Sequence, residues 1–248
     1  MNIIEYFDIN LKTKELISIV GGGGKTTTMF KLANELKALN KRVLVTTTTA
    51  IYNPDADQYD KLIILGKDNA YGRYLNNTIT VMGREVSAQN KLLGAFPEYI
   101  DYIYKEELFD YIIVEADGSK GRPIKAPASH EPVIPSCTTK TIGVVGMDCL
   151  GKRIDDEYVH RSELFAQITD SSIGEYIREE TILKLIVSKN GIFKGVPYSS
   201  KKYLLFNKAD YQKDREAAIK IKNLVVESEY DVNGIIVGSM NSGNIIRF

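Results

Sequence analysis

The sequence has few of the residues that mark several classes of protein, and each shortage argues against one of those classes. Among 248 residues there are two cysteines, two histidines and equal numbers of basic and acidic residues, 32 of each. Cys137 and Cys149 form no C-x-x-C pair and cannot make a disulfide framework. The balanced charge argues against nucleic acid as a partner. The sequence also lacks an apolar run of membrane-spanning length and a signal-peptide pattern near its start. We therefore expect a cytoplasmic protein with no membrane partner.

Strand and helix patterns alternate along the chain. The apolar runs are continuous, which is typical of a parallel sheet covered by helices on both faces. We expect strands at residues 16–20, 42–49, 62–65, 111–114, 141–147, 203–206 and 235–237, and a helix from Lys25. Residues 78–94 alternate instead and predict a small β-hairpin insertion at the rim. The fold class is therefore α/β and P-loop NTPase-like, as a single domain over residues 1–248.

A run of glycines joins the first expected strand to the first expected helix. Glycine permits the unusual dihedrals of a loop whose N–H groups converge on a triphosphate, and the helix N-terminus adds positive charge. Lys25 can reach the β- and γ-phosphates, and the Thr26 hydroxyl can bind Mg²⁺. Ile19 replaces the first glycine of the usual pattern, so the run is closer to the G-x-x-G-K-T-T form of Mur ligases. The predicted binding residues are Gly21, Gly22, Gly23, Gly24, Lys25, Thr26 and Thr27.

Two acids end the strand expected at residues 111–114. Ligands of open α/β sheets bind at the carboxyl ends of the strands. Glu115 and Asp117 are therefore candidate Mg²⁺ ligands or catalytic groups together with Lys25 and Thr26. The sequence leaves open which of the two acids binds the metal. The threonines at 46–49 are candidate sensors of the γ-phosphate at the end of the neighbouring strand.

A second motif indicates a site for the nucleotide base. Asn207, Lys208 and Asp210 form N-K-x-D after an apolar strand. Such a carboxylate accepts hydrogen bonds from N1–H and the exocyclic amine of guanine, a donor pair that adenine lacks. Ser239 would close over the base. The motif favours GTP over ATP, although Asp210 could instead cap the following helix.

These segments together resemble the YqeC family over residues 16–239. The resemblance rests on V-G-G-G-G-K-T-T, V-E-A-D-G-S-K-G-R-P-I-K-A-P, H-E-P-V-I-P, G-M-D, V-H-R and N-K-A-D. Proteins of this family are described as accessory proteins of selenium-dependent molybdenum hydroxylases. The resemblance therefore implies a client hydroxylase, or its molybdenum cofactor, as a partner.

The same resemblance draws attention to the loop after Asp117. Four of the seven prolines lie there, which predicts a stiff loop. A loop that covers the phosphates or receives a small anionic ligand would use Lys120, Arg122, Lys125, His130 and Glu131, and the following His160-Arg161 could contact the same ligand. The two histidines and two cysteines match no zinc spacing, so Mg²⁺ is the metal that we expect.

Three functions fit these patterns. The first is an accessory protein that binds and hydrolyses GTP or ATP with Mg²⁺. The second is a small-molecule kinase or a Mur-like ATP-dependent ligase, which the glycine loop would permit. The third is a nucleotide-gated binding module without catalysis.

Overall fold

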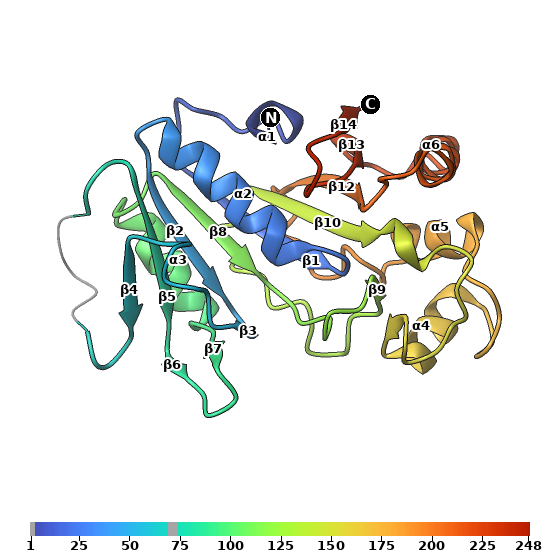
Figure 1. The fold of residues 1–248 in the computed structure, drawn as a ribbon, viewed down its shortest axis with the longest axis horizontal. Coiled ribbons are helices and arrows are strands. Elements are labelled where there is room, and N and C mark those ends of the chain that lie inside the picture. The colour runs from blue at the N-terminus through green and yellow to red at the C-terminus, as the bar shows by residue number, and fades with distance from the viewer. Residues whose placement is uncertain (1–2, 69–73) are drawn as a thin grey trace.

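A large, mostly parallel sheet forms the centre of the computed structural model, which describes residues 3–68 and 74–248 (Figure 1). Its strands are β1 (Glu15–Gly21), β2 (Arg42–Thr47), β4 (Lys61–Ile64), β5 (Thr78–Gly83), β8 (Tyr111–Glu115), β10 (Lys140–Gly146), β12 (Lys201–Asn207), β13 (Gly234–Gly238) and β14 (Ile245–Arg247). Their order is β14-β13-β12-β10-β1-β8-β2-β5-β4, and β14 is the antiparallel member.

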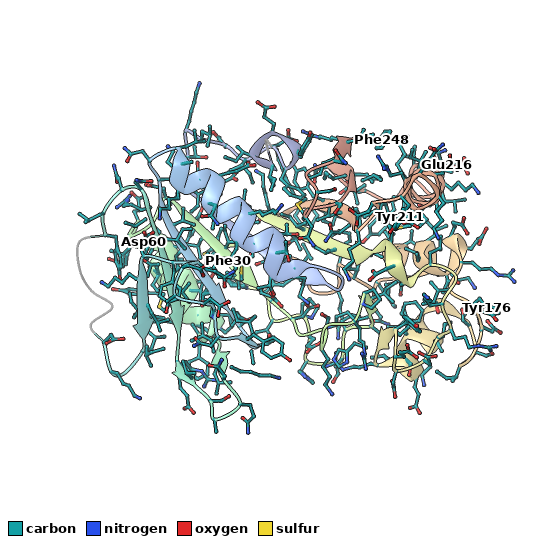
Figure 2. All side chains as sticks on the ribbon, in the orientation of Figure 1. Phe30, Asp60, Tyr176, Tyr211, Glu216 and Phe248 are labelled. Atoms are coloured by element: carbon teal, nitrogen blue, oxygen red, sulfur yellow. The ribbon has the colours of Figure 1, made fainter. Side chains whose placement is uncertain are left out.

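Helices cover both faces of this sheet, as the continuous apolar runs predicted. One face carries α1 (Ile3–Tyr6) and α2 (Lys25–Ala38), and Phe30 of α2 belongs to the buried cluster beneath them (Figure 2). The buried cluster on the opposite face includes residues of α3 (Pro97–Lys105), α4 (Ser162–Thr169), α5 (Glu179–Val187) and α6 (Gln212–Glu227). Successive residues of β1 point into opposite clusters. Leu16 packs in the cluster that includes α3 to α6, and Ile17 packs in the cluster beneath α1 and α2. In the described part of the chain, no helix is both long and apolar enough to cross a bilayer.

The segment predicted as a rim insertion divides into two parts. Residues Thr78–Gly83 form β5, a buried strand paired in parallel with β2 and β4, so this half of the prediction is wrong. The hairpin itself is shorter: β6 (Glu85–Val86) pairs antiparallel with β7 (Lys91–Leu93), which also pairs with β3 (Ala50–Tyr52). Alternating threonines made β5 resemble a half-exposed strand, yet Thr80 is buried.

The carboxyl ends of the central strands meet at one edge of the sheet. β1 lies between β8 and β10, and parallel register sets Ile19 beside Glu115 and Gly146 beside Asn207. The chain runs from β1 toward β2 on one side and later crosses to β10 on the other. β1 is therefore at a switch point, where open α/β sheets bind ligands.

Candidate functional site

The glycine run forms a tight connection between β1 and α2. Gly21, Gly23 and Gly24 have positive φ angles of 96°, 81° and 122°, a region that side chains disfavour. Space is also lacking, because a Cβ on each of the four glycines would collide with protein atoms. These are the Val144 carbonyl, the Arg122 carbonyl, the Gly146 backbone and the Asn207 side chain, for Gly21 to Gly24 in turn. The run is therefore fixed by packing as well as by dihedral angles.

Three backbone N–H groups of the glycine run already donate hydrogen bonds to protein acceptors. The Gly21 N–H donates to Asp117 Oδ2 at 3.0 Å, and the Gly22 and Gly23 N–H groups donate to carbonyls of Val144 and Arg122. The expectation that every N–H of the run converges on a ligand therefore needs correction. The first N–H groups of a helix have no intrahelical acceptor, and Gly24 provides no side-chain cap for α2. Donors for an anion are thus concentrated at the first turn of α2.

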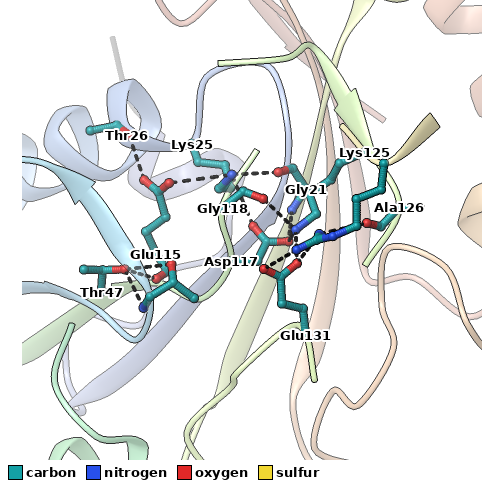
Figure 3. Close-up of polar contacts among 12 residues, drawn as sticks. Gly21, Lys25, Thr26, Thr47, Glu115, Asp117, Gly118, Lys125, Ala126 and Glu131 are labelled. Carbon is teal, nitrogen blue, oxygen red and sulfur yellow. Dashed lines mark hydrogen bonds and ion pairs between the residues drawn. The ribbon is translucent and has the colours of Figure 1, made fainter. Parts of the chain in front are cut away.

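Lys25, Glu115 and Asp117 meet beside this turn (Figure 3). The Lys25 Nζ donates to the Gly21 carbonyl at 2.7 Å and lies 3.2 Å from Asp117 Oδ1 and 3.6 Å from Glu115 Oε1. The Thr26 hydroxyl donates to Glu115 Oε2 at 2.7 Å. Lys25, Glu115 and Asp117 are only 3%, 6% and 2% exposed. The structure thus brings together all the predicted catalytic and metal-binding side chains.

Burial and charge act against each other in this cluster. Burial opposes the charge of Lys25, but the carboxylates of Asp117 and Glu115 outweigh it and raise the pKa of the lysine. Burial also raises the pKa of Glu115, against the opposing effects of Lys25 and Thr26. A buried charge is costly unless a partner compensates it. The protonated lysine is therefore held by carboxylates that an anionic ligand could replace.

A second set of ion pairs extends from Asp117 into the proline-rich loop. Lys125 Nζ lies 3.1 Å from Asp117 Oδ2 and 2.5 Å from Glu131 Oε2, and it donates to the Gly118 carbonyl. Arg161 binds both Glu131 oxygens, at 2.6 and 3.0 Å. Lys125 and Glu131 are therefore buried in an internal ion-pair chain rather than presented on the surface of the loop.

The buried ion pairs around Lys125 shift the pKa values of Glu131 and His160. Burial would raise the pKa of Glu131, but hydrogen bonds from Arg161 and Lys125 lower it to about 2. Burial and the nearby Arg161 and Lys125 lower the pKa of His160 to about 4. His160 lies in β11 (Val159–His160), which pairs with β9 (Ile124–Lys125) and holds the loop against the start of α4. At neutral pH, His160 is uncharged and Glu131 is ionised.

The other loop residues lie closer to solvent. Lys120 and His130 are exposed, and Arg122 is half-buried with its carbonyl on the glycine run. The proline-rich loop therefore lies against the glycine run through its backbone. The hydroxyls of the strand-end threonines also bind backbone atoms. Those of Thr46, Thr47 and Thr48 donate to the carbonyls of Met82, Glu115 and Val133, in that order.

The predicted base motif lies at the end of β12, next to the glycine run. Asn207 Nδ2 donates to the Gly23 carbonyl at 2.8 Å, and its Oδ1 accepts from the Met240 N–H at 2.9 Å. Asp210 is exposed, whereas Ser239 is buried. Tyr211, rather than Asp210, is the N-cap of α6, which removes the capping alternative. Asn207 therefore ties the glycine run to the loop after β13.

Sequence reasoning missed several partners of these residues. Asp148 accepts from Lys208 Nζ at 2.7 Å, and Arg161 clamps Glu131 from 30 positions away. Asp148 and Arg161 belong to the motifs G-M-D and V-H-R, but the spacing of residues along the sequence did not predict which side chains they contact. The backbone of Arg122 offered no signal at all.

Thr26, Glu115 and Asp117 are the residues that could hold Mg²⁺ together with a bound phosphate. Within residues 3–68 and 74–248, no three His, Cys, Asp or Glu side chains are grouped to hold a metal ion. Mg²⁺ usually keeps several waters and takes one or two carboxylates together with substrate phosphates. Thr26 and Glu115 offer a hydroxyl and a carboxylate side by side, and Asp117 lies next to them.

Comparisons with known proteins identify a family and a relative that this chain resembles. A family model described as YqeC protein matches residues 17–163. A relative from Escherichia coli (strain K12), named Uncharacterized protein YqeC, is 33% identical over 232 residues. That match covers 92% of this chain and 89% of the relative.

Proposed function

We propose that this chain, which belongs to the YqeC family, is a cytoplasmic protein that binds and hydrolyses a nucleoside triphosphate with Mg²⁺. The observation that carries the proposal is the buried Lys25 at the first turn of α2, held between Glu115 and Asp117. A helix N-terminus favours anions. A lysine at this position is best explained by an anionic ligand that the helix N-terminus and the lysine would bind together. Phosphate oxygens would then replace the carboxylates as partners of Lys25.

The roles of the two acids follow from their contacts. Glu115 accepts from Thr26, the residue that P-loop sites use for Mg²⁺, so we assign Glu115 to the metal side. Asp117 would orient the attacking water. In hydrolysis, the water oxygen bonds to the γ-phosphorus, the bond to the β–γ bridging oxygen breaks, and the proton of the water leaves through Asp117 to solvent. The products are a nucleoside diphosphate and inorganic phosphate.

Asn207, Lys208 and Asp210 support GTP as the nucleotide. Asn207 is fixed by the glycine run, Lys208 is held by Asp148, and the exposed Asp210 carboxylate is accessible to a base. Against adenine, this carboxylate would face an acceptor and lose its hydrogen bonds, which costs about 1–3 kcal/mol.

A titration with GTP, with and without Mg²⁺, tests the proposal. The wild-type protein should bind GTP and release phosphate, and Lys25→Met should lose both. Lys140→Met is the matched control, because Lys140 forms an equally buried ion pair with Glu15 at the opposite edge of the sheet. A wild-type protein that binds no nucleotide, or a Lys25→Met variant that binds as tightly as wild type, would sink the proposal.

The accessory role is the part that depends on family resemblance. We propose that turnover serves the maturation of a selenium-dependent molybdenum hydroxylase or its cofactor. Addition of such a hydroxylase should then increase the rate of phosphate release. Nucleotide consumption that requires a small acceptor would instead indicate a kinase or ligase. Tight binding with no turnover would indicate a binding module.

A further inference from the structure

We infer that Lys125, fixed by Glu131 and Arg161, is a positioning residue for Asp117 in the proposed hydrolysis. This inference rests on the proposed function, and it gives a role to buried charges that face each other rather than a ligand. The starting point is the unequal set of contacts around the two oxygens of the Asp117 carboxylate.

The two carboxylate oxygens of Asp117 have different partners. Oδ2 accepts from the Gly21 N–H at 3.0 Å and lies 3.1 Å from Lys125 Nζ. Oδ1 is buried, makes no hydrogen bond among the described residues, and has the Lys25 ammonium 3.2 Å away. One oxygen is therefore fixed by the fold, and the other depends on Lys25.

Nucleotide binding would make the contacts of these two oxygens differ more. When Lys25 turns to the β- and γ-phosphates, Oδ1 loses its cation and becomes available to a water molecule. Oδ2 keeps both its partners, since neither Gly21 nor Lys125 has to move. Lys125 then supplies the remaining positive charge that compensates the buried carboxylate and fixes its plane.

Lys125 is itself held in place from the other side. Its ammonium contacts Glu131 at 2.5 Å and the Gly118 carbonyl at 2.7 Å. Glu131 is clamped by two hydrogen bonds from Arg161, at the start of α4. A lysine stem is flexible, so anchoring by Glu131 and the Gly118 carbonyl is what makes it a precise support. The ion pairs from Arg161 through Glu131 and Lys125 thus fix Oδ2, and with it the plane of the Asp117 carboxylate, relative to α4.

The test compares turnover with binding in purified full-length variants. Partners that orient a reacting group typically contribute about 10- to 100-fold to activity. Lys125→Met should therefore lower kcat for GTP by at least about tenfold while the Kd for GTP changes by less than about threefold. Lys125→Arg, which keeps the charge, should restore most of kcat. Glu131→Gln, which keeps Lys125, should lower kcat less than Lys125→Met does.

Lys140→Met separates positioning from stability, because it breaks a buried ion pair of the same length away from the site. It should lower the melting temperature as Lys125→Met does but leave kcat near wild type. Equal falls in kcat for these two variants, or parallel loss of binding and turnover in Lys125→Met, would overturn the inference. If Lys125→Met does not fold, an unchanged kcat in Glu131→Gln overturns it instead. A wild type without turnover would reject the proposed function, and the inference with it.

Discussion

The phosphate end and the base end of the proposed site contain similar numbers of charged residues, but they hold them differently. At the phosphate end, Lys25 and Asp117 are buried and compensate each other. At the base end, Lys208 and Asp148 form an ion pair near solvent, and Asp210 is exposed. A buried charge depends on its partner, whereas an exposed one is compensated by water. The phosphate end is thus also part of the stability of the fold, and the base end is nearly independent of it.

The comparison predicts its largest effect for matched lysine substitutions. Lys25→Met leaves the buried Glu115 without a cation and Asp117 with Lys125 alone, and it should lower the free energy of unfolding by about 3–5 kcal/mol. Lys208→Met breaks an exposed pair and should cost less than about 1 kcal/mol. Urea denaturation of both variants measures the difference. Similar losses would show that the two ends are not distinct.

Acid should weaken the fold at β11 and the proline-rich loop, where His160 and Glu131 lie. The folded protein holds the pKa of His160 at about 4 against an ordinary 6.5, so the unfolded state binds more protons between these values. Stability should fall by up to about 2 kcal/mol as pH drops from about 6.5 to about 4, because each unit of pKa difference is worth at most about 1.4 kcal/mol and solvent screens this half-buried group. The pKa of Glu131, about 2 against 4.5, extends the loss at lower pH in the same direction.

Denaturation at a series of pH values checks this prediction. His160→Gln should remove the upper part of the decline and keep the part below about pH 4.5, which belongs to Glu131. A wild-type stability that stays constant from pH 6.5 to 4 would contradict the buried, neutral state of His160.

Asn207 joins the two ends and should show an intermediate effect. Asn207→Ala removes the bonds to the Gly23 carbonyl and the Met240 N–H, and it should cost about 1–2 kcal/mol of stability. Because the change loosens the glycine run rather than the base contacts, GTP and ATP should weaken by the same factor. A selective loss of GTP, measured by competition, would place Asn207 at the base instead.

The smallest effect on stability should come from Asp210→Asn. Its exposed side chain predicts a change within about 0.5 kcal/mol. The effect on specificity should be larger: a wild-type preference for GTP over ATP of at least about tenfold should be lost, while xanthosine triphosphate binds better. Competition between labelled GTP and unlabelled ATP measures both. Displacement of GTP by an equal concentration of ATP from the wild type would reject the guanine assignment.

Sequence reasoning predicted the elements that local pattern determines. The strand ends with Gly21, Glu115 and Asn207 meet because parallel strands place their carboxyl ends on one edge, so order along the chain was enough. The pairing of Lys125 with Glu131 depends on the path of an irregular loop, which no periodicity describes. The interior position of β5 depends on which strands flank it, because a half-polar run can still be covered on both faces.

The four glycines have a consequence for the evolution of such sequences. Each is enclosed by atoms of the protein itself, so a descendant that had lost its ligand would still be unable to accept a larger residue there. The glycine run alone is therefore a poor record of ancestral chemistry. Lys25, Glu115 and Asp117 are a better record, because a change at Lys25 leaves Glu115 buried without a cation and Asp117 with Lys125 alone. Loss of function in this lineage should appear as three coupled substitutions behind an intact glycine turn.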